Sequence, residues 1–405
     1  MSWVEGADES QYSIHHLPFG VFSTRDDPTP RIGVRIADFV LDMRMSVASG
    51  TCPGCPTCAA LSAPALNPFM SLGRAAWSQV RGQVQESLTN TEFQRSIAQL
   101  LVPVSQVRMH LPFVPGDFVD FLASGDHAAN LGRIYRPEDV DPLPPAWRHL
   151  PPGHHGRAGS VVVSGTDIVR PAGQRRDARG DISFGPSAKL DIEAELGFVV
   201  GVPTNLGSPV GADSFADHVF GVVLVNDWSA RDIGSFEYKP LGPLNGKSFA
   251  TSVSGWVTPL EALAAARGAA PEQPATEGYL KESDRFGYDV AINVHWNGTE
   301  VSRPSTSGLY WTPAQLLAQL TSGGAALRTG DLFATGAVSG PRPSQAATFL
   351  ELSHDGARPI LLDDGSDRTY LQDGDTVTLT ATAPGPRGTT VGLGEVTAMI
   401  RPAIG

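Results

Sequence analysis

The segment Phe220-Gly-Val-Val-Leu-Val-Asn-Asp-Trp-Ser-Ala-Arg-Asp232 joins an apolar run to a polar run in the middle of the chain. Its first half is apolar and β-branched, which is typical of a buried strand. Asp227 follows where this strand should end, and such positions often carry a ligand-binding or catalytic side chain. An aspartate there can also simply cap the next turn. The segment alone leaves both interpretations open.

A second strand is expected just before it, in Leu190-Asp-Ile-Glu-Ala-Glu-Leu-Gly-Phe-Val-Val-Gly201. The period of two in a strand places Glu193 and Glu195 on one face. Two adjacent like charges leading into an apolar strand are costly unless a cation lies between them. Together with Asp227 they would supply three oxygen donors for a hard cation such as Mg²⁺ or Ca²⁺. A solvated acidic face on an edge strand is the alternative.

From Pro112 onward the sequence alternates short β-branched runs with Gly, Pro and Asp turns, and the whole chain contains 44 glycines and 33 prolines. Such frequent turn residues favour short strands over long helices. The best helix candidate runs from Thr312 to Gly323, with Pro313 near its start. The segment from Glu261 to Glu282 is rich in Ala, Pro and Gly, and we expect it to be an exposed excursion. The clearest predicted strands are Ser160–Ser164, Leu196–Gly201, Phe220–Val225 and Thr376–Thr380.

The first ~110 residues are predicted to form a separate unit, since 405 residues exceed one ordinary core. Arg31–Asp42 alternates as in a small β-domain, and a helical stretch should follow from about Phe69 to Leu101. Between them, Ala48–Pro68 is predicted to be a loop of small residues and prolines.

The formal charge is −12 without any basic run, which argues against nucleic acid as a partner. Acidic excess is equally consistent with plain solubility. The segment Met1–Tyr12 lacks the apolar core of a signal peptide, and no apolar run is long enough to cross a bilayer. With only three cysteines, these features predict a cytoplasmic protein.

Three further segments carry polar groups with weaker signals. His127 lies among carboxylates in Asp117–Asn130, where a histidine can serve as a general base, although a lone histidine is more often an ordinary surface or capping residue. The glycine-rich segment Leu150–Ser160 is interpreted, taken alone, as a structural turn. Cys52, Cys55 and Cys58 have C-x₂-C-x₂-C spacing, but no other cysteine supplies a fourth ligand, so an incidental surface loop is favoured over metal binding.

Taken together and in order, several motifs closely resemble the fumarylacetoacetase family, nearly from end to end. The resemblance implies a mainly β fold with some α: a small SH3-like N-terminal barrel over residues 1–112, then a mixed β-roll catalytic domain over 113–405, with homodimers built through the larger domain. The motifs that carry it are Leu17-Pro-Phe-Gly-Val-Phe-Ser23, Pro30-Arg-Ile-Gly-Val34, Ala128-Ala-Asn-Leu-Gly132, His155-Gly-Arg-Ala158, Val161-Val-Val-Ser-Gly-Thr166, Asn226-Asp-Trp-Ser-Ala-Arg-Asp232 and Gly246-Lys-Ser-Phe249.

Family members hydrolyse the carbon–carbon bond of fumarylacetoacetate, giving fumarate and acetoacetate at the end of tyrosine breakdown. The resemblance therefore implies a metal-dependent hydrolase of a 1,3-diketo acid, fumarylacetoacetate or an acylpyruvate-like relative, with Mg²⁺ or Ca²⁺ (Mn²⁺ as a further option) as cofactor. Carried over residue by residue, it assigns His127 as general base oriented by Glu351, Arg231 and Lys247 to the developing oxyanion, and Arg136 and Tyr238 to the substrate. The implied metal site comprises Asp120, Glu193, Glu195 and Asp227, with Lys247 and Thr251 nearby.

Four substrate-side positions depart from the family pattern. Leu122 and His154 stand where the family has substrate-binding tyrosines, Gly234 replaces an oxyanion-hole glutamine, and Ala337 replaces a threonine. A pocket without two phenols should be wider or accept a different acid. A second hypothesis therefore keeps the fold and the metal but changes the reaction to a decarboxylation, an isomerisation or another C–C step. A third, a non-catalytic scaffold, is disfavoured because six ionisable groups remain whose burial is costly.

Overall fold

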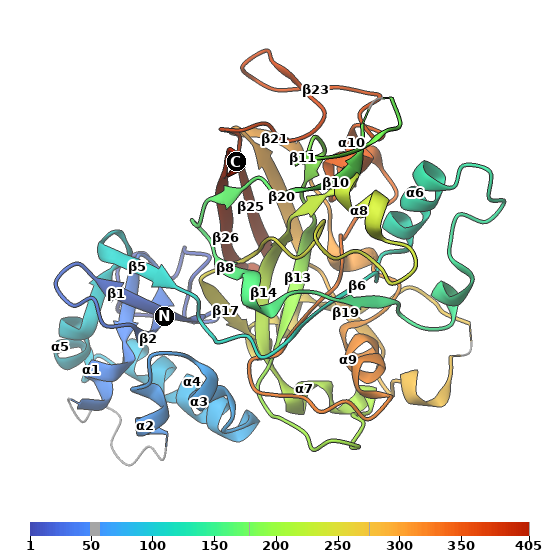
Figure 1. The fold of residues 1–405 in the computed structure, drawn as a ribbon. Helices are drawn as coiled ribbons and strands as arrows, with labels where there is room; N and C mark the ends of the chain where they lie inside the picture. Colours follow the sequence, from blue (N-terminus) through green and yellow to red (C-terminus); the bar gives the residue numbers. More distant parts are fainter. Residues whose placement is uncertain (49–56, 178, 275, 405) are drawn as a thin grey trace.

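A computed structural model describes residues 1–48, 57–177, 179–274 and 276–404. The predicted fold class, mainly β with some α, is confirmed. Figure 1 shows a small unit formed by the beginning of the chain beside a larger body of long strands. Within the described ranges, none of the helices combines the length and the apolar character needed to span a bilayer.

The N-terminal unit is built on five strands, with β1 pairing to β2 and β5, β2 to β3, and β3 to β4. The segment Arg31–Asp42, predicted from its alternation to belong to a small β-domain, forms β2 and β3, and the turn between them places Ala37 at φ +48°. The bounds are β1 (Phe19–Thr24), β2 (Arg31–Ile36), β3 (Phe39–Asp42), β4 (Leu101–Pro103), β5 (Val107–His110), α1 (Met43–Ala48), α2 (Cys58–Leu61), α3 (Asn67–Met70), α4 (Arg74–Thr89) and α5 (Gln94–Ile97).

The prediction of one helical stretch from Phe69 to Leu101 is wrong, because the chain there forms the separate helices α3, α4 and α5. Gly73, at φ +84°, separates α3 from α4, and the extended backbone of Asn90 ends α4. Gly73 takes a non-helical conformation that a glycine adopts readily, so the backbone breaks there although the apolar periodicity continues. The predicted loop Ala48–Pro68 contains α2 in its described part. Cys52 and Cys55 lie outside the described residues, and Cys58 begins α2.

The small unit is joined to the larger one by a shared sheet. β1 pairs antiparallel with β17 (Trp256–Pro259), with Phe19 opposite Val257. The rings of Phe19, Phe69 and Phe220 lie with centroids 5.2–5.8 Å apart, so one apolar cluster contains side chains from both parts of the chain. Burial of aromatic surface stabilises this junction. The boundary between residues 112 and 113 stays a prediction.

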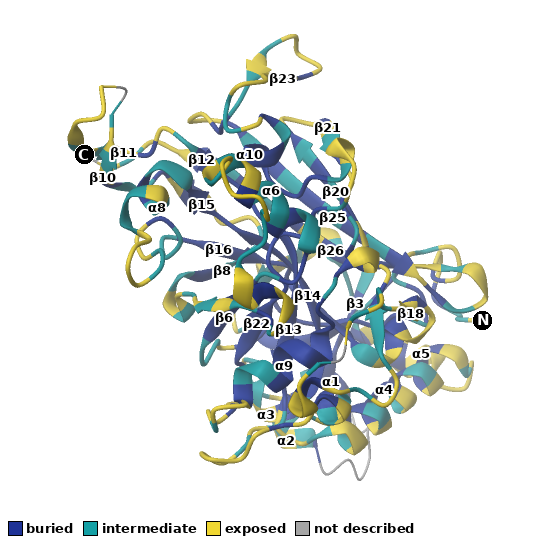
Figure 2. Ribbon diagram, turned by 90° about the vertical axis from the view of Figure 1, so that its right-hand side faces the viewer, coloured by how far each residue is buried: buried dark blue, intermediate teal, exposed yellow. Residues whose placement is uncertain are grey.

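In the larger unit, the main sheet continues from β17 through β14, β13, β22 and β6 to β7. Its central strands are buried along their whole length and appear dark blue in Figure 2. The four predicted strands are confirmed as β8 (Val161–Val163), β13 (Ala194–Val200), β14 (Val219–Asp227) and β25 (Thr376–Pro384). The strands of this sheet are β6 (Phe118–Phe121), β7 (Gly153–His155), β8 (Val161–Val163), β13 (Ala194–Val200), β14 (Val219–Asp227), β16 (Thr251–Val253), β17 (Trp256–Pro259) and β22 (Leu332–Ala334).

A second sheet, in the order β21-β20-β25-β26-β9, packs beside it, and the largest apolar cluster contains side chains from both sheets. Short two-stranded pairs complete the fold. The remaining strands are β9 (Ile168–Val169), β10 (Ala172–Arg176), β11 (Ile182–Pro186), β12 (Leu190–Asp191), β15 (Ser229–Ala230), β18 (Arg267–Ala269), β19 (Phe286–Tyr288), β20 (Ala291–Trp296), β21 (Thr299–Ser302), β23 (Ile360–Leu361), β24 (Asp367–Arg368), β25 (Thr376–Pro384) and β26 (Thr390–Arg401).

The helix predicted from Thr312 is confirmed as α9, where Thr312 and Gln315 form a reciprocal capping box. The exposed excursion predicted for Glu261–Glu282 is wrong in part. Ala262, Leu263 and Ala266 are buried in a 3₁₀ turn, and Leu280 is also buried. The helices of the larger unit are α6 (Gly125–Tyr135), α7 (Phe215–His218), α8 (Arg231–Glu237), α9 (Pro313–Thr321) and α10 (Phe349–Leu352).

Candidate active site

Four acidic side chains converge at the ends of three strands of the main sheet. Asp120 lies on β6, Glu193 directly precedes β13, Glu195 is the second residue of β13, and Asp227 ends β14. β13 pairs directly with β14, and β22 bridges β13 to β6, so the register brings these ends together. One carboxylate oxygen from each residue lies within 4.8 Å of the others. The structure therefore assembles the four acids that the sequence singled out.

The cluster is buried, and Glu195 is the acid in it with the fewest polar contacts. Glu195 is fully buried, and among the described residues neither of its carboxylate oxygens has a hydrogen-bond partner. Burial, together with the charges of Asp120 and Asp227, raises the pKa of Glu195 well above its usual range. Burial also raises the pKa of Asp227 to about 6, against the opposing charge of Lys247.

Two cations contact the cluster from the cavity side. Lys247 Nζ lies 2.6 Å from Asp227 Oδ2 and 3.0 Å from Glu193 Oε2. Arg231, at the start of α8, bridges Glu193 Oε1 and Asp191 Oδ2, each at 2.7 Å. Burial opposes ionisation of Glu193, but Lys247 and Arg231 outweigh it and hold the pKa of Glu193 well below its usual range.

The residues fit a divalent cation. Among the described residues, the five carboxylates (Asp191 included) contact Lys247, Arg231 and His154. Even with all three protonated, buried negative charge remains that is costly without a counter-ion. Both carboxylate oxygens of Glu195 and Oδ1 of Asp120 have no hydrogen-bond partner among the described residues, which also indicates a missing positive charge. Oxygen-only donors of this kind suit a hard divalent ion. Thr251 lies beside them, donating its hydroxyl to Asp227 Oδ1 at 2.6 Å.

His127 and Glu351 form a buried pair next to this cluster. His127 lies in the first turn of α6, which Ser124 caps by accepting a hydrogen bond from the His127 amide. His127 Nδ1 lies 2.8 Å from Glu351 Oε2. Burial disfavours the imidazolium, but the charge and hydrogen bond of Glu351 outweigh it, so the pKa of His127 is raised above 6.5. With Nδ1 held by the carboxylate, Nε2 is left for a water or a ligand.

Several residues that position this machinery were missed by sequence reasoning. Glu351 accepts further hydrogen bonds from Asn130 Nδ2 at 2.8 Å, Ser339 Oγ at 2.6 Å and Thr348 Oγ1 at 2.9 Å. Asp191 is fully buried; besides Arg231, it accepts hydrogen bonds from the first amides of α10. Asp191, Glu193 and Glu195 alternate in the sequence, but Asp191 ends β12, Glu193 lies between the strands and Glu195 lies on β13, so no single strand pattern marks Asp191.

One cavity of about 600 Å³ opens onto the acids and the histidine, a size typical of small-ligand sites. Glu195, Asp227, Thr251 and Glu351 lie behind its wall. Every position assigned to the substrate lines it, and the catalytic and ligand roles themselves stay predictions. The sequence-predicted residues in its lining are Asp120, Leu122, His127, Arg136, His154, Glu193, Arg231, Gly234, Tyr238, Lys247 and Ala337.

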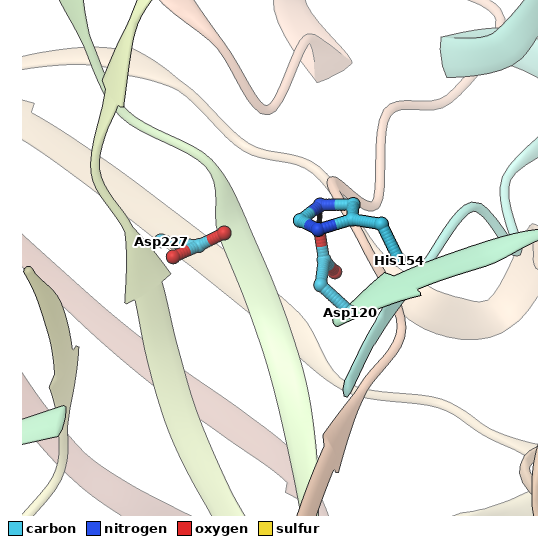
Figure 3. Close-up of side chains that lie close together, drawn as sticks. All are labelled: Asp120, His154 and Asp227. Carbon is cyan, nitrogen blue, oxygen red and sulfur yellow. Dashed lines mark hydrogen bonds and ion pairs between the residues drawn. The ribbon is translucent and has the colours of Figure 1, made fainter. Parts of the chain in front are cut away.

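The segment Leu150–Ser160, predicted as a structural turn, instead contains β7. β7 pairs antiparallel with β6 and places His154 opposite Asp120. His154 Nε2 lies 3.1 Å from Asp120 Oδ2, and Figure 3 shows the two side chains in contact. The turn signals in this segment did not reveal the strand, because three residues pair only through contacts distant in sequence.

Gly336 lines the cavity and has a backbone conformation that other residues rarely adopt. It has φ +72°, and a Cβ there would lie 1.9 Å from the carbonyl oxygen of Phe121. Gly336→Ala should lower the free energy of unfolding by about 1–3 kcal/mol from backbone strain alone. Gly234→Ala is the control, since its Cβ would meet no described atom within 4 Å. Urea denaturation measures both, and equal midpoints for the two variants would refute the argument.

A buried carboxylate cluster suited to a divalent cation, beside a His–Glu pair in one cavity, is the arrangement expected of a metal-assisted acid–base enzyme. Comparisons with known proteins agree with this class. Residues 118–400 match the fumarylacetoacetate hydrolase C-terminal family model, and residues 15–112 match the fumarylacetoacetase N-terminal model. The chain therefore belongs to the fumarylacetoacetate hydrolase family.

The chain is similar to curated fumarylacetoacetases over its full length. It is 41% identical to that of Homo sapiens over 419 residues, covering 100% of this chain and 99% of the relative. It is 42% identical to that of Oryza sativa subsp. japonica over 423 residues, covering 100% and 97%.

Solved structures share the fold at lower identity. A fumarylacetoacetate hydrolase from Exiguobacterium antarcticum has a TM-score of 0.54 at 17% identity, covering 95% of this chain and 99% of its own. A maleylpyruvate hydrolase from Sphingobium sp. SYK-6, in complex with Mn²⁺ and pyruvate, has a TM-score of 0.52 at 14% identity, covering 96% and 100%.

Proposed function

We propose that this protein hydrolyses a carbon–carbon bond of a 1,3-diketo acid, with fumarylacetoacetate as substrate, at the end of tyrosine breakdown. The observation that carries the proposal is the convergence of the acidic cluster and the His127–Glu351 pair on one cavity. About 40% identity to named fumarylacetoacetases along the whole chain supports the substrate.

Asp120, Glu193, Glu195 and Asp227 would hold a divalent cation, whose chemical contribution when bound is Lewis-acid polarisation of the diketone oxygens. Four oxygen-donating side chains suit Mg²⁺ or Ca²⁺, and Mn²⁺, the ion bound in one structural neighbour, accepts such ligands as well.

The side chains of this protein divide the remaining work. His127 accepts a proton from water at Nε2 while Glu351 steadies the imidazolium, and the resulting hydroxide attacks a carbonyl carbon. Lys247 and Arg231 place positive charge beside the oxyanion that develops. The carbon–carbon bond breaks, the attacked carbonyl becomes a carboxylate, and the departing carbon receives the proton held by His127.

The diketone absorbance of fumarylacetoacetate, followed with purified protein and Mg²⁺, Ca²⁺ or Mn²⁺, tests this proposal. We expect the signal to disappear, with one ¹⁸O atom entering a product carboxylate when the reaction is run in ¹⁸O-labelled water. Consumption without label would favour a decarboxylase or isomerase, and a stable signal would exclude this substrate.

The Glu351 carboxylate predicts a change in pH dependence. His127 must be neutral to accept a proton, so kcat/KM should rise with pH through its raised pKa. Glu351→Gln removes the charge that stabilises the imidazolium, so the acidic limb should move to lower pH. Glu300→Gln, in an exposed ion pair with Arg303, should leave the limb unchanged. Profiles of kcat/KM from about pH 5 to about pH 9 measure the position of the acidic limb. An acidic limb at the same pH in Glu351→Gln and in the wild type would contradict this prediction.

We also propose a homodimer built through the larger unit and a cytoplasmic location. Exposed apolar side chains on β11 and on the loop after α8, such as Phe184 at 76% and Leu241 at 96% exposure, support a self-association surface. Sedimentation equilibrium tests the dimer, and cell fractionation tests the location.

A further inference from the structure

The pairing of β7 with β6 fixes what faces the acidic cluster from the open side of the cavity. In this antiparallel register residue 154 lies directly opposite Asp120, and such cross-strand pairs point to the same face of the sheet. The strand pairing therefore places the side chain of His154 beside the cluster. Its Nε2 lies 3.1 Å from Asp120 Oδ2.

His154 and the acids form one set of donor atoms. One nitrogen of His154 and one carboxylate oxygen each of Asp120 and Asp227 lie within 4.8 Å of one another. The set of four acids shares Asp120 and Asp227 with this second set. Figure 3 shows the imidazole beside Asp120, with the Asp227 carboxylate directed toward both. Glu195, which is fully buried and has no hydrogen-bond partner among the described residues, belongs to that set of four acids.

The second ring nitrogen of His154 has a partner suited to a metal-ligating histidine. Nδ1 lies 3.4 Å from the backbone carbonyl oxygen of His155. A proton on Nδ1 donated toward that carbonyl leaves the Nε2 lone pair directed at the cluster. Ligating histidines are generally held in this way, with the other N–H on a carbonyl or carboxylate.

We propose that His154 Nε2 is a ligand of the divalent cation, and that this nitrogen makes the site prefer Mn²⁺ to Mg²⁺ and Ca²⁺. The inference rests on the cation site of the proposed function and specifies its donor set. Mg²⁺ and Ca²⁺ favour oxygen ligands alone, whereas an imidazole strengthens binding of first-row transition ions. A neutral His154 adds a donor atom without adding charge. It should therefore change which divalent ion the site prefers more than it changes the electrostatic attraction of the site for cations in general.

Metal binding to the purified full-length protein tests this without any assay of turnover. Free Mn²⁺ is measured by electron paramagnetic resonance, with Mg²⁺ and Ca²⁺ as competitors, in the wild type, His154→Phe and His155→Phe. His155 is the control because it is the next residue of the same strand and points to the other face. His154→Phe should weaken Mn²⁺ binding by about 10-fold or more, while Mg²⁺ binding changes much less.

Pulsed measurements on bound Mn²⁺ should detect ¹⁴N coupling in the wild type and His155→Phe, and none from this position in His154→Phe. Tight Mn²⁺ binding with identical selectivity and identical nitrogen coupling in all three proteins would overturn the role of His154 and leave the acidic site standing. Absence of binding by all three ions to the wild type would overturn this inference together with the cation site on which it rests.

Discussion

Replacing His127 with glutamine should lower kcat by about 10²–10⁴-fold, the usual contribution of a positioned general base. The Glu351 carboxylate, 2.8 Å from Nδ1, holds the imidazole so that Nε2 remains for water, and glutamine cannot accept a proton in its place. Steady-state kinetics with fumarylacetoacetate measure the loss.

The same variant should bind Mn²⁺ with nearly wild-type affinity, because His127 is not among the donor atoms of the acidic cluster. His149→Gln is the control, since His149 is exposed and takes no part in the cavity lining. A variant that loses cation binding and activity together would show that His127 acts as a ligand or supports the fold, rather than as a base.

Replacing Glu195 with glutamine should change stability and cation binding in opposite directions. Glu195 is fully buried without a described hydrogen-bond partner, so removing its charge from the metal-free protein should raise the free energy of unfolding by about 1–3 kcal/mol. In the wild type this cost grows as pH rises from the ordinary range of a glutamate through the raised pKa of Glu195. The variant should lack that loss of stability.

A divalent cation supplies the missing counter-charge. When it is added, the wild type should therefore become more stable than Glu195→Gln. Saturation at 100 times Kd stabilises a protein by about 2.7 kcal/mol, and Glu195→Gln should gain much less at the same concentration. Thermal unfolding with EDTA and with Mn²⁺ measures both effects, with the exposed Glu92→Gln as control. If Glu195→Gln is less stable than the wild type in EDTA, the charge of Glu195 does not destabilise the metal-free protein, and the prediction is wrong.

The parts of the fold that could be predicted from sequence are those with an uninterrupted local pattern. The apolar run before Asp227 and the alternation around Glu195 determine strands and the faces of their side chains, so the central acids followed from periodicity. α9 followed from Thr312 and Pro313, which are local start signals.

The remainder depended on contacts between distant segments. Asp120 as a metal ligand and Glu351 as the partner of His127 were assigned through family resemblance. The segment around His127 gave only a weak signal for a general base, and nothing within it pairs residue 127 with residue 351. The strand at Gly153–His155 exists only because β6 lies beside it, and three residues carry too short a pattern to predict. Asp191 was overlooked because its role is to hold Arg231 and α10, which only the folded arrangement brings together.

A crystal structure of the protein soaked in Mn²⁺, with the ion located by its anomalous scattering, tests most directly whether the acids bind a cation. We expect a single strong peak within coordination distance of Asp120, Glu195 and Asp227, facing the cavity that His127 lines. An anomalous map with no peak among these acids, from crystals whose Mn²⁺ concentration saturates the protein in solution, would contradict this expectation.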